Sequence, residues 1–197
     1  GKIDDVRLAG DLRQTTYRTS NVRKNSKYLT MGFGQFLQDR HLDCRIDPET
    51  LRVCHRCPQA IVDLADALYP ALPPTVSSVE ILTDELHVGI FLVGESDVAE
   101  YNERYGAACL VYNRTTKVPS GIHAQNMGAV KGRTFDRVLL FPTSKMRDWL
   151  FDHSVDLQPS TRSRLYVAIT RARLSVAIVV PDPLVDNASR EFRAWNR

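Results

Sequence analysis

The chain has 197 residues, of which 43% are hydrophobic and 25% charged, and its formal net charge is +3 at pH 7. This balance is typical of one globular domain and excludes broad disorder. No apolar run approaches the roughly 20 residues of a membrane-spanning helix, so we expect a cytoplasmic protein with no membrane partner. The mild positive charge permits an anionic partner without requiring one.

Apolar runs alternate with helical patterns along the chain. The runs that predict strands are Val6–Ala9, Leu51–Cys54, Val88–Val93, Ala108–Tyr112, Ile122–Asn126, Arg137–Phe141 and Ser175–Val180. The patterns that predict helices are Phe33–Arg40, Pro58–Leu68, Asp97–Tyr105, Thr143–Phe151 and Arg162–Arg173. Several strands are apolar throughout, as strands covered on both faces are. The alternation predicts an α/β fold with a mostly parallel sheet flanked by helices.

Two polar segments are predicted to be loops. Pro70–Ser78 contains Pro73-Pro74, which ends the preceding helix, and is interpreted as a surface loop. Asn21–Lys27 is polar and basic. It is interpreted as a solvated loop, and contact with phosphate is the alternative.

The chain contains four cysteines, Cys44, Cys54, Cys57 and Cys109, and Cys54 and Cys57 form a C-x-x-C pair. A zinc site would usually need a second pair of ligands at suitable spacing, and the sequence offers none. We therefore expect reduced, structural cysteines and no metal bound by this chain.

Several polar residues are predicted to lie near the ends of strands, where ligands bind in open parallel sheets. Gln14 follows the first predicted strand, and its amide could orient a water or contact a terminal phosphate. Arg56 follows the second strand. Lys131 and Gly132 lie between two later strands, where glycine permits a close approach of the backbone. Arg171 lies near the end of the last predicted helix.

That last helix is predicted to be amphipathic. At 3.6 residues per turn, Leu165, Ile169 and Ala172 fall in one sector, and Arg164 and Arg171 fall in another, roughly 100° away. The two arginines are therefore predicted to face away from the core. Solvated surface charge, or interaction with the helix dipole, is the alternative to a role in binding.

Five segments in this order resemble the C-terminal half of a UvrD/Rep-type superfamily 1 helicase. GDLRQTTYR resembles motif III, LRVCHRCPQAIVDLA motif IV, GAVKGRTFDRVLLF motif V and LYVAITRAR motif VI, and AACLVYNRTTK resembles the strand and turn before motif V. The resemblance spans Val6 to Val180. It implies a RecA-like fold of the P-loop NTPase type, with residues 1–19 ending a first domain and residues 20–197 forming a second without an inserted domain.

The resemblance also implies an ATP-dependent DNA helicase or translocase that clamps ATP and Mg²⁺ between two RecA-like domains. Gln14 would sense the γ-phosphate, and Arg56 and Arg171 would be arginine fingers, whose planar guanidinium groups suit phosphoryl oxygens. The other residues implied at ATP are Lys131, Gly132 and Thr134. The residues implied at single-stranded DNA are Tyr17, Arg18, Tyr112, Asn113 and Arg114.

The sequence departs from the family pattern in several respects. It contains no G-x-x-x-x-G-K-[ST], so we expect the phosphate cradle and the magnesium ligands in an upstream RecA-like domain and no ATP turnover by this chain alone. Thr83–His87 resembles the acidic magnesium motif but follows motif III, so it is interpreted as a polar turn. Gly128 and Thr134 stand where histidine and glutamate are usual. The alternative function is a non-hydrolysing module that binds nucleic acid or protein.

Overall fold

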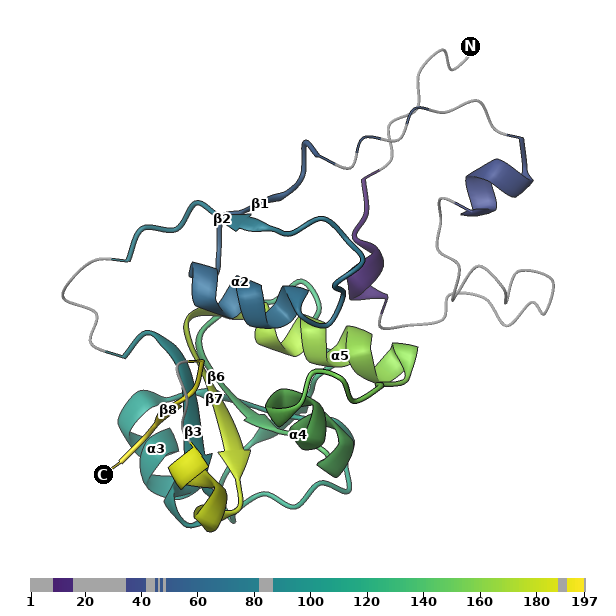
Figure 1. The fold of residues 1–197 in the computed structure, drawn as a ribbon. Coiled ribbons are helices and arrows are strands. Elements are labelled where there is room, and N and C mark those ends of the chain that lie inside the picture. Colours follow the sequence, from purple (N-terminus) through teal and green to yellow (C-terminus); the bar gives the residue numbers. More distant parts are fainter. Residues whose placement is uncertain are drawn as a thin grey trace.

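The computed structural model describes residues 9–15, 35–41, 45, 47, 49–81, 87–187 and 191–196. These residues build a parallel sheet with helices on both faces and a smaller sheet at one end (Figure 1). Residues 35–39 are helical, within the predicted helix Phe33–Arg40. Of the predicted strand Val6–Ala9 only Ala9 is described, and Cys44, Asn21–Lys27 and Thr83–Leu86 lie outside the described residues. No helix in the described ranges is long and apolar enough to span a membrane.

The main sheet has six strands in the order β5-β4-β6-β7-β3-β8, and every neighbouring pair is parallel. The strands are β3 (Gly89–Gly94), β4 (Ala108–Val111), β5 (Ala124–Asn126), β6 (Phe135–Phe141), β7 (Ala172–Val180) and β8 (Arg193–Ala194). The predicted α/β fold with a mostly parallel sheet is confirmed. β8 could not be predicted from the sequence, because two residues are too few to show a periodic pattern.

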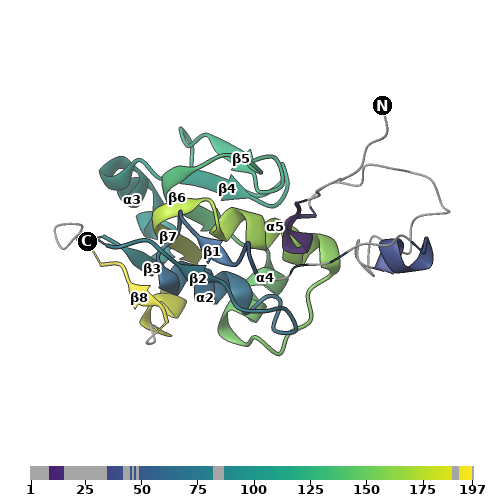
Figure 2. The same cartoon turned by 90° about the horizontal axis from the view of Figure 1, so that it is seen from above.

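Helices cover the two faces of the main sheet. α3 (Val98–Tyr105) lies on one face, and α2 (Gln59–Asp66), α4 (Ser144–Phe151) and α5 (Pro159–Ile169) lie on the other (Figure 2). Side chains of a strand point alternately to the two faces, so Leu92 of β3 packs with α2, α4 and α5. Its neighbour in the strand, Val93, packs with α3. Burial on both faces explains why these strands are apolar throughout.

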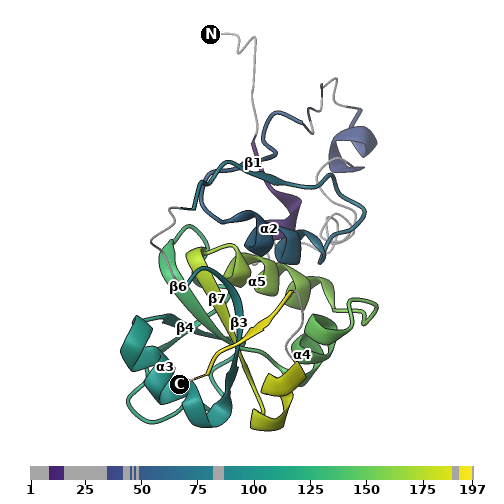
Figure 3. The ribbon, with the colours of Figure 1, turned by 60° about the vertical axis from the view of Figure 1, so that its left-hand side comes forward.

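β1 (Val53–Cys54) and β2 (Val76–Ser77) form a separate two-stranded parallel sheet, with α2 in the connection between them. Figure 3 shows β1 at the end of the molecule where α2 lies, apart from the main sheet. The predicted strand Leu51–Cys54 is confirmed in its last two residues. The prediction of Pro70–Ser78 as a loop throughout is wrong, because Val76 and Ser77 pair with β1.

The helix predicted over Arg162–Arg173 begins and ends earlier than expected. α5 begins at Pro159, which suits a first helical position, and ends at Ile169. β7 begins at Ala172, so Arg171 lies in a short connection and not in a helix. Neither glycine nor proline marks this boundary in the sequence, and the apolar pattern continues across it. Arg164 and Arg171 therefore do not share a helical face.

Gly132 has a φ angle of +86° in the connection between β5 and β6, where residues with a Cβ atom are strained. No described atom lies within 4 Å of the place of a Cβ atom, so the backbone angle, rather than the close approach we expected, requires glycine. We expect Gly132→Ala to lower the free energy of unfolding by about 1–2 kcal/mol in urea denaturation. Gly10→Ala is the control, because Gly10 has equally open surroundings and no positive φ. An equal loss in both variants would contradict the prediction.

Candidate functional site

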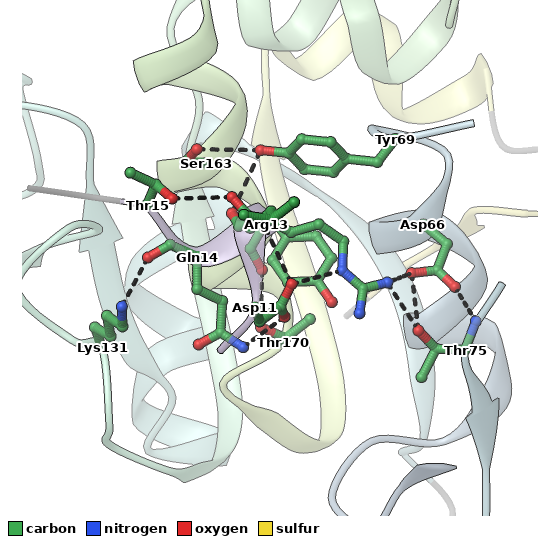
Figure 4. Close-up of polar contacts among 12 residues, drawn as sticks. Asp11, Arg13, Gln14, Thr15, Asp66, Tyr69, Thr75, Lys131, Ser163 and Thr170 are labelled. Carbon is green, nitrogen blue, oxygen red and sulfur yellow. Dashed lines mark hydrogen bonds and ion pairs between the residues drawn. The ribbon is translucent and has the colours of Figure 1, made fainter. Parts of the chain in front are cut away.

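The segment around Gln14 forms a single turn of 3-10 helix, η1 (Leu12–Gln14). The Asp11 carboxylate caps this turn by accepting a hydrogen bond from the Arg13 backbone N–H at 3.0 Å. The same carboxylate accepts hydrogen bonds from Arg13 Nε at 2.9 Å and from Gln14 Nε2 at 2.8 Å (Figure 4). Asp11 therefore fixes the side chains of both residues.

Arg13 joins η1 to three other parts of the fold. Its Nη1 donates at 2.9 Å both to Asp66 Oδ1 in α2 and to Thr75 Oγ1 before β2. Its Cζ lies 5.1 Å from the ring centroid of Tyr166 in α5. The side chains of Arg13 and Asp66 are only 15% and 16% exposed, so water screens their ion pair weakly. Arg13 was not among the predicted site residues, and its one signal in the sequence is its place between Asp11 and Gln14.

Lys131 reaches η1 from the connection before β6. Its Nζ donates a hydrogen bond to the Gln14 carbonyl at 2.9 Å, which brings together two residues that the sequence analysis places at ATP. Gly132 and Thr134 lie exposed in the same connection. Of the six predicted ATP residues, the structure thus brings Gln14 and Lys131 into direct contact.

The other two predicted ATP residues, Arg56 and Arg171, come from distant parts of the chain and meet at Thr170. Arg56 lies in a bend between β1 and α2, and its Nη1 donates to the Thr170 carbonyl at 3.0 Å. Arg171 follows Thr170 in the chain, and its Nη2 donates to Thr170 Oγ1 at 3.1 Å. The structure therefore places both guanidinium groups at the C-terminal end of α5.

Arg171 is only 2% exposed, which corrects the prediction that it faces away from the core. Its Nε donates to the Val167 carbonyl at 3.0 Å and its Nη1 to the Arg133 carbonyl at 3.3 Å. Burial, and then the nearby charge of Arg56, lower the pKa of Arg171. A guanidinium group keeps its proton in proteins, so Arg171 remains a buried cation held by neutral oxygens.

Neither arginine has a close carboxylate partner among the residues that the structure describes. Within the described part of the chain, no ion pair includes Arg56 or Arg171. Asp11 raises the pKa of Arg171 only as a minor influence, after the larger effects of burial and Arg56. A buried charge is costly unless an opposite charge offsets it, so this pair is suited to bind an anion with several oxygens.

Tyr112, the first predicted DNA residue that the structure describes, lies beside the N-terminal part of α5. Its hydroxyl is 3.2 Å from Thr161 Oγ1, and its ring centroid is 4.9 Å from Cζ of Arg164. The half-buried Arg164 thus stacks on an aromatic ring and does not point into solvent. An aromatic ring paired with an arginine can support the stacking of a nucleobase.

The neighbouring predicted DNA residues have different surroundings. Asn113 is a turn residue, because its Oδ1 accepts hydrogen bonds from the Thr115 N–H at 3.2 Å and the Thr115 hydroxyl at 2.8 Å. Arg114 is exposed. Tyr17 and Arg18 lie outside the described residues.

The two groups of predicted residues lie at opposite ends of α5, whose 11 residues span about 16 Å. Tyr112 is near its first turn, and Arg171 follows its last.

The Phe135 N–H at the start of β6 donates to the Arg171 carbonyl at 2.9 Å. Arg171 therefore lies at the amino end of β7, beside the start of β6, so the expectation that it lies where strands end is wrong. Lys131 lies in the connection between β5 and β6, as predicted.

No protein-family model matches the sequence, and no curated protein matches it. Among solved structures, a PRRSV helicase is 24% identical with a TM-score of 0.44, over 70% of this chain and 24% of that one. Arterivirus nonstructural protein 10, a helicase solved in complex with DNA, is 26% identical with a TM-score of 0.40, over 67% and 26%. The C-terminal domain of a possible DNA helicase from Lactobacillus plantarum WCFS1 is 14% identical with a TM-score of 0.40, over 71% and 98%. The chain spans about a quarter of the two viral helicases.

Proposed function

We propose that this chain is the second RecA-like domain of a UvrD/Rep-type superfamily 1 DNA helicase or translocase. It would supply cations to an ATP molecule that another RecA-like domain of the same protein holds. The observation that carries the proposal is the meeting of Arg56 and Arg171 at Thr170, where neither forms an ion pair with a described residue. The order of the five sequence motifs is the support for the proposed assignment to the UvrD/Rep-type family.

In this proposal Arg56 and Arg171 act on the γ-phosphate as it is transferred to water. Their guanidinium groups would stabilise the charge that spreads over the phosphoryl oxygens. Backbone carbonyls already hold Arg171 in place, so little reorganisation is needed when ATP arrives. Gln14 would exchange its hydrogen bond with Asp11 for one to the γ-phosphate or to the attacking water.

Mg²⁺ would come with the nucleotide, and its protein ligands would belong to the other RecA-like domain. Among the described residues, no group of three His, Cys, Asp or Glu side chains could hold a metal ion. The donors that this chain offers, Arg56, Lys131 and Arg171, are cations and therefore fit the phosphate oxygens and not the metal.

Single-stranded DNA would lie at the other end of α5. Tyr112, supported by Arg164, would stack on a base, and the exposed Arg114 would contact the phosphate backbone. Tyr17 and Arg18 are proposed for the same track by the resemblance of motif III. This arrangement would leave α5 between the nucleotide and the nucleic acid.

The proposal is tested by measuring ATP turnover with and without single-stranded DNA. We expect the full-length protein to turn over ATP faster when the DNA is present, and the 197-residue chain alone to show no turnover in either condition. The chain alone should still bind single-stranded DNA weakly, with an affinity that falls as salt is added. Turnover by the pure chain, or none by the full-length protein, would contradict the proposal and favour a non-hydrolysing module.

A further inference from the structure

Cys54 and Cys57 lie on the two sides of the bend that carries Arg56. The Cys57 backbone N–H donates to Cys54 Sγ at 3.4 Å, so the chain folds back sharply between the two residues. Both thiols are free, Cys54 is half-buried and Cys57 is buried. Pro58 and the start of α2 follow directly. A C-x-x-C pair before a helix is an arrangement in which two sulfurs can join through a small movement.

We propose that Cys54 and Cys57 form a redox-active dithiol, which small-molecule disulfides oxidise to an intramolecular disulfide. The site itself rests on the geometry of the bend. Its expected effect on ATP turnover rests on the function proposed above, because Arg56 lies between the two cysteines. The two parts can therefore fail separately.

The reaction has two exchange steps. The Cys54 thiolate attacks one sulfur of the small disulfide, which forms a mixed disulfide and releases one small thiolate. Cys57 then gives its proton to solvent, and its sulfur attacks Cys54 Sγ and releases the second small thiolate. In total the protein loses two electrons and two protons, and the small disulfide becomes two thiols.

The surroundings make Cys54 the attacking thiol. A hydrogen bond from the Cys57 thiol, and then those from the backbone N–H groups and the charge of Arg56, lower the pKa of Cys54. The hydrogen bond with Cys54, and then burial, raise the pKa of Cys57. Among the described residues, the other ionisable groups that interact with the pair are Tyr166 from α5 and Arg171 after it. Cys54 is also the more exposed of the two.

The state of Cys57 bears directly on the arginine pair. The Cys57 thiol has one proton, which it donates to the Thr170 carbonyl at 3.4 Å while Cys54 is protonated and to the Cys54 thiolate once that forms. The same carbonyl oxygen accepts the Arg56 hydrogen bond at 3.0 Å. A disulfide has no S–H to donate, and Sγ of Cys57 would move toward Cys54. Oxidation would therefore break a contact with the residue before Arg171 and reshape the bend that positions Arg56.

The test treats the full-length protein with glutathione disulfide and maps its cysteines by mass spectrometry. We expect a Cys54–Cys57 disulfide, a loss of ATP turnover of about 10²-fold from displaced arginines, and recovery with dithiothreitol. Cys57→Ser should stop at the mixed disulfide on Cys54, and Cys54→Ser should resist oxidation and keep its turnover. Cys109→Ser is the control, because Cys109 is buried at 3% exposure in the other face of the main sheet and should leave the response unchanged.

Alkylation by iodoacetamide gives a measurement that does not depend on ATP. Cys54 should react fastest, and its rate should reach half of its plateau well below the pKa of about 8.5 of a free cysteine. Three results would each contradict the proposal of a redox-active dithiol. They are a Cys54 that reacts no faster than Cys109, a disulfide that does not form, and a stoichiometric zinc ion that protects both thiols. A disulfide that forms without changing turnover would overturn only its link to Arg56.

Discussion

Replacing Arg171 by alanine is expected to lower the DNA-stimulated ATP turnover of the full-length protein by about 10³- to 10⁵-fold, the contribution of an arginine finger. Nucleotide binding should change little, because the other domain would hold most of the triphosphate. The reason is the position of Arg171, which is a buried cation beside Arg56 and forms no ion pair within the described residues. Turnover and equilibrium binding of a fluorescent ATP analogue are the two measurements.

Arg173→Ala is the matched control for this experiment. Arg173 lies two positions later, its side chain is 58% exposed, and it pairs with Asp136 at 2.5 Å. Turnover should stay near that of the unmodified protein. Arg171→Lys keeps the charge but cannot reproduce the hydrogen bonds to Val167 and Arg133, so an intermediate loss is expected. Near-normal turnover of Arg171→Ala would mean that the residue only supports the fold.

Thermal unfolding of the same variants separates catalysis from folding. Arg171 also donates to the carbonyls of Val167 and Arg133, so its removal should cost some stability. A role in the fold alone would make the loss of turnover disappear at temperatures where the variant is fully folded. A role at the phosphate would leave the loss unchanged there.

Arg13→Ala is expected to lower the free energy of unfolding of the chain by about 3 kcal/mol, because removing one partner of a largely buried pair leaves the other charge uncompensated. The residues left behind are Asp66 and Asp11, which Arg13 contacts at 2.9 Å through Nη1 and Nε. The loss should appear in urea denaturation. Asp66→Asn in the same chain should restore part of it, because the orphaned charge is then removed.

Arg173→Ala again supplies the comparison, since exposed ion pairs contribute about 0–1 kcal/mol. Both side chains of that pair are more than half exposed, at 58% and 56%. If Arg13→Ala cost no more than Arg173→Ala, the ion pair would not tie η1 to α2. A loss confined to Arg13→Ala would establish it as the anchor of the segment that carries Gln14.

The parts of the fold that could be predicted from the sequence are those with a local pattern. The strands β3, β4, β6 and β7 contain apolar runs buried on both faces, and the helix α2 has its apolar residues on one side after Pro58. These features depend on neighbours in the sequence. For the same reason β2 and β8, with two residues each, gave no usable pattern.

The site was harder to predict because its contacts are distant in sequence. Gln14, Lys131, Arg56 and Arg171 were identified by type and motif. The structure joins Gln14 with Lys131, and Arg56 with Arg171. The burial of Arg171 could not be foreseen, because carbonyl groups from two separate segments hold it. The ion pair of Arg13 joins residues 53 positions apart, so no local pattern indicates it.

Arg171 and Arg56 are next to strands that differ in stability. Arg171 directly precedes β7, which lies inside the main sheet between β6 and β3. Arg56 follows a strand of two residues in the small sheet, where Val53 and Val76 are 47% and 52% exposed. A two-stranded sheet is marginal by itself, so local opening there costs far less than in β7. Under the proposed function, Arg56 would therefore be the arginine that adjusts its position to the phosphate, and Arg171 would keep its place.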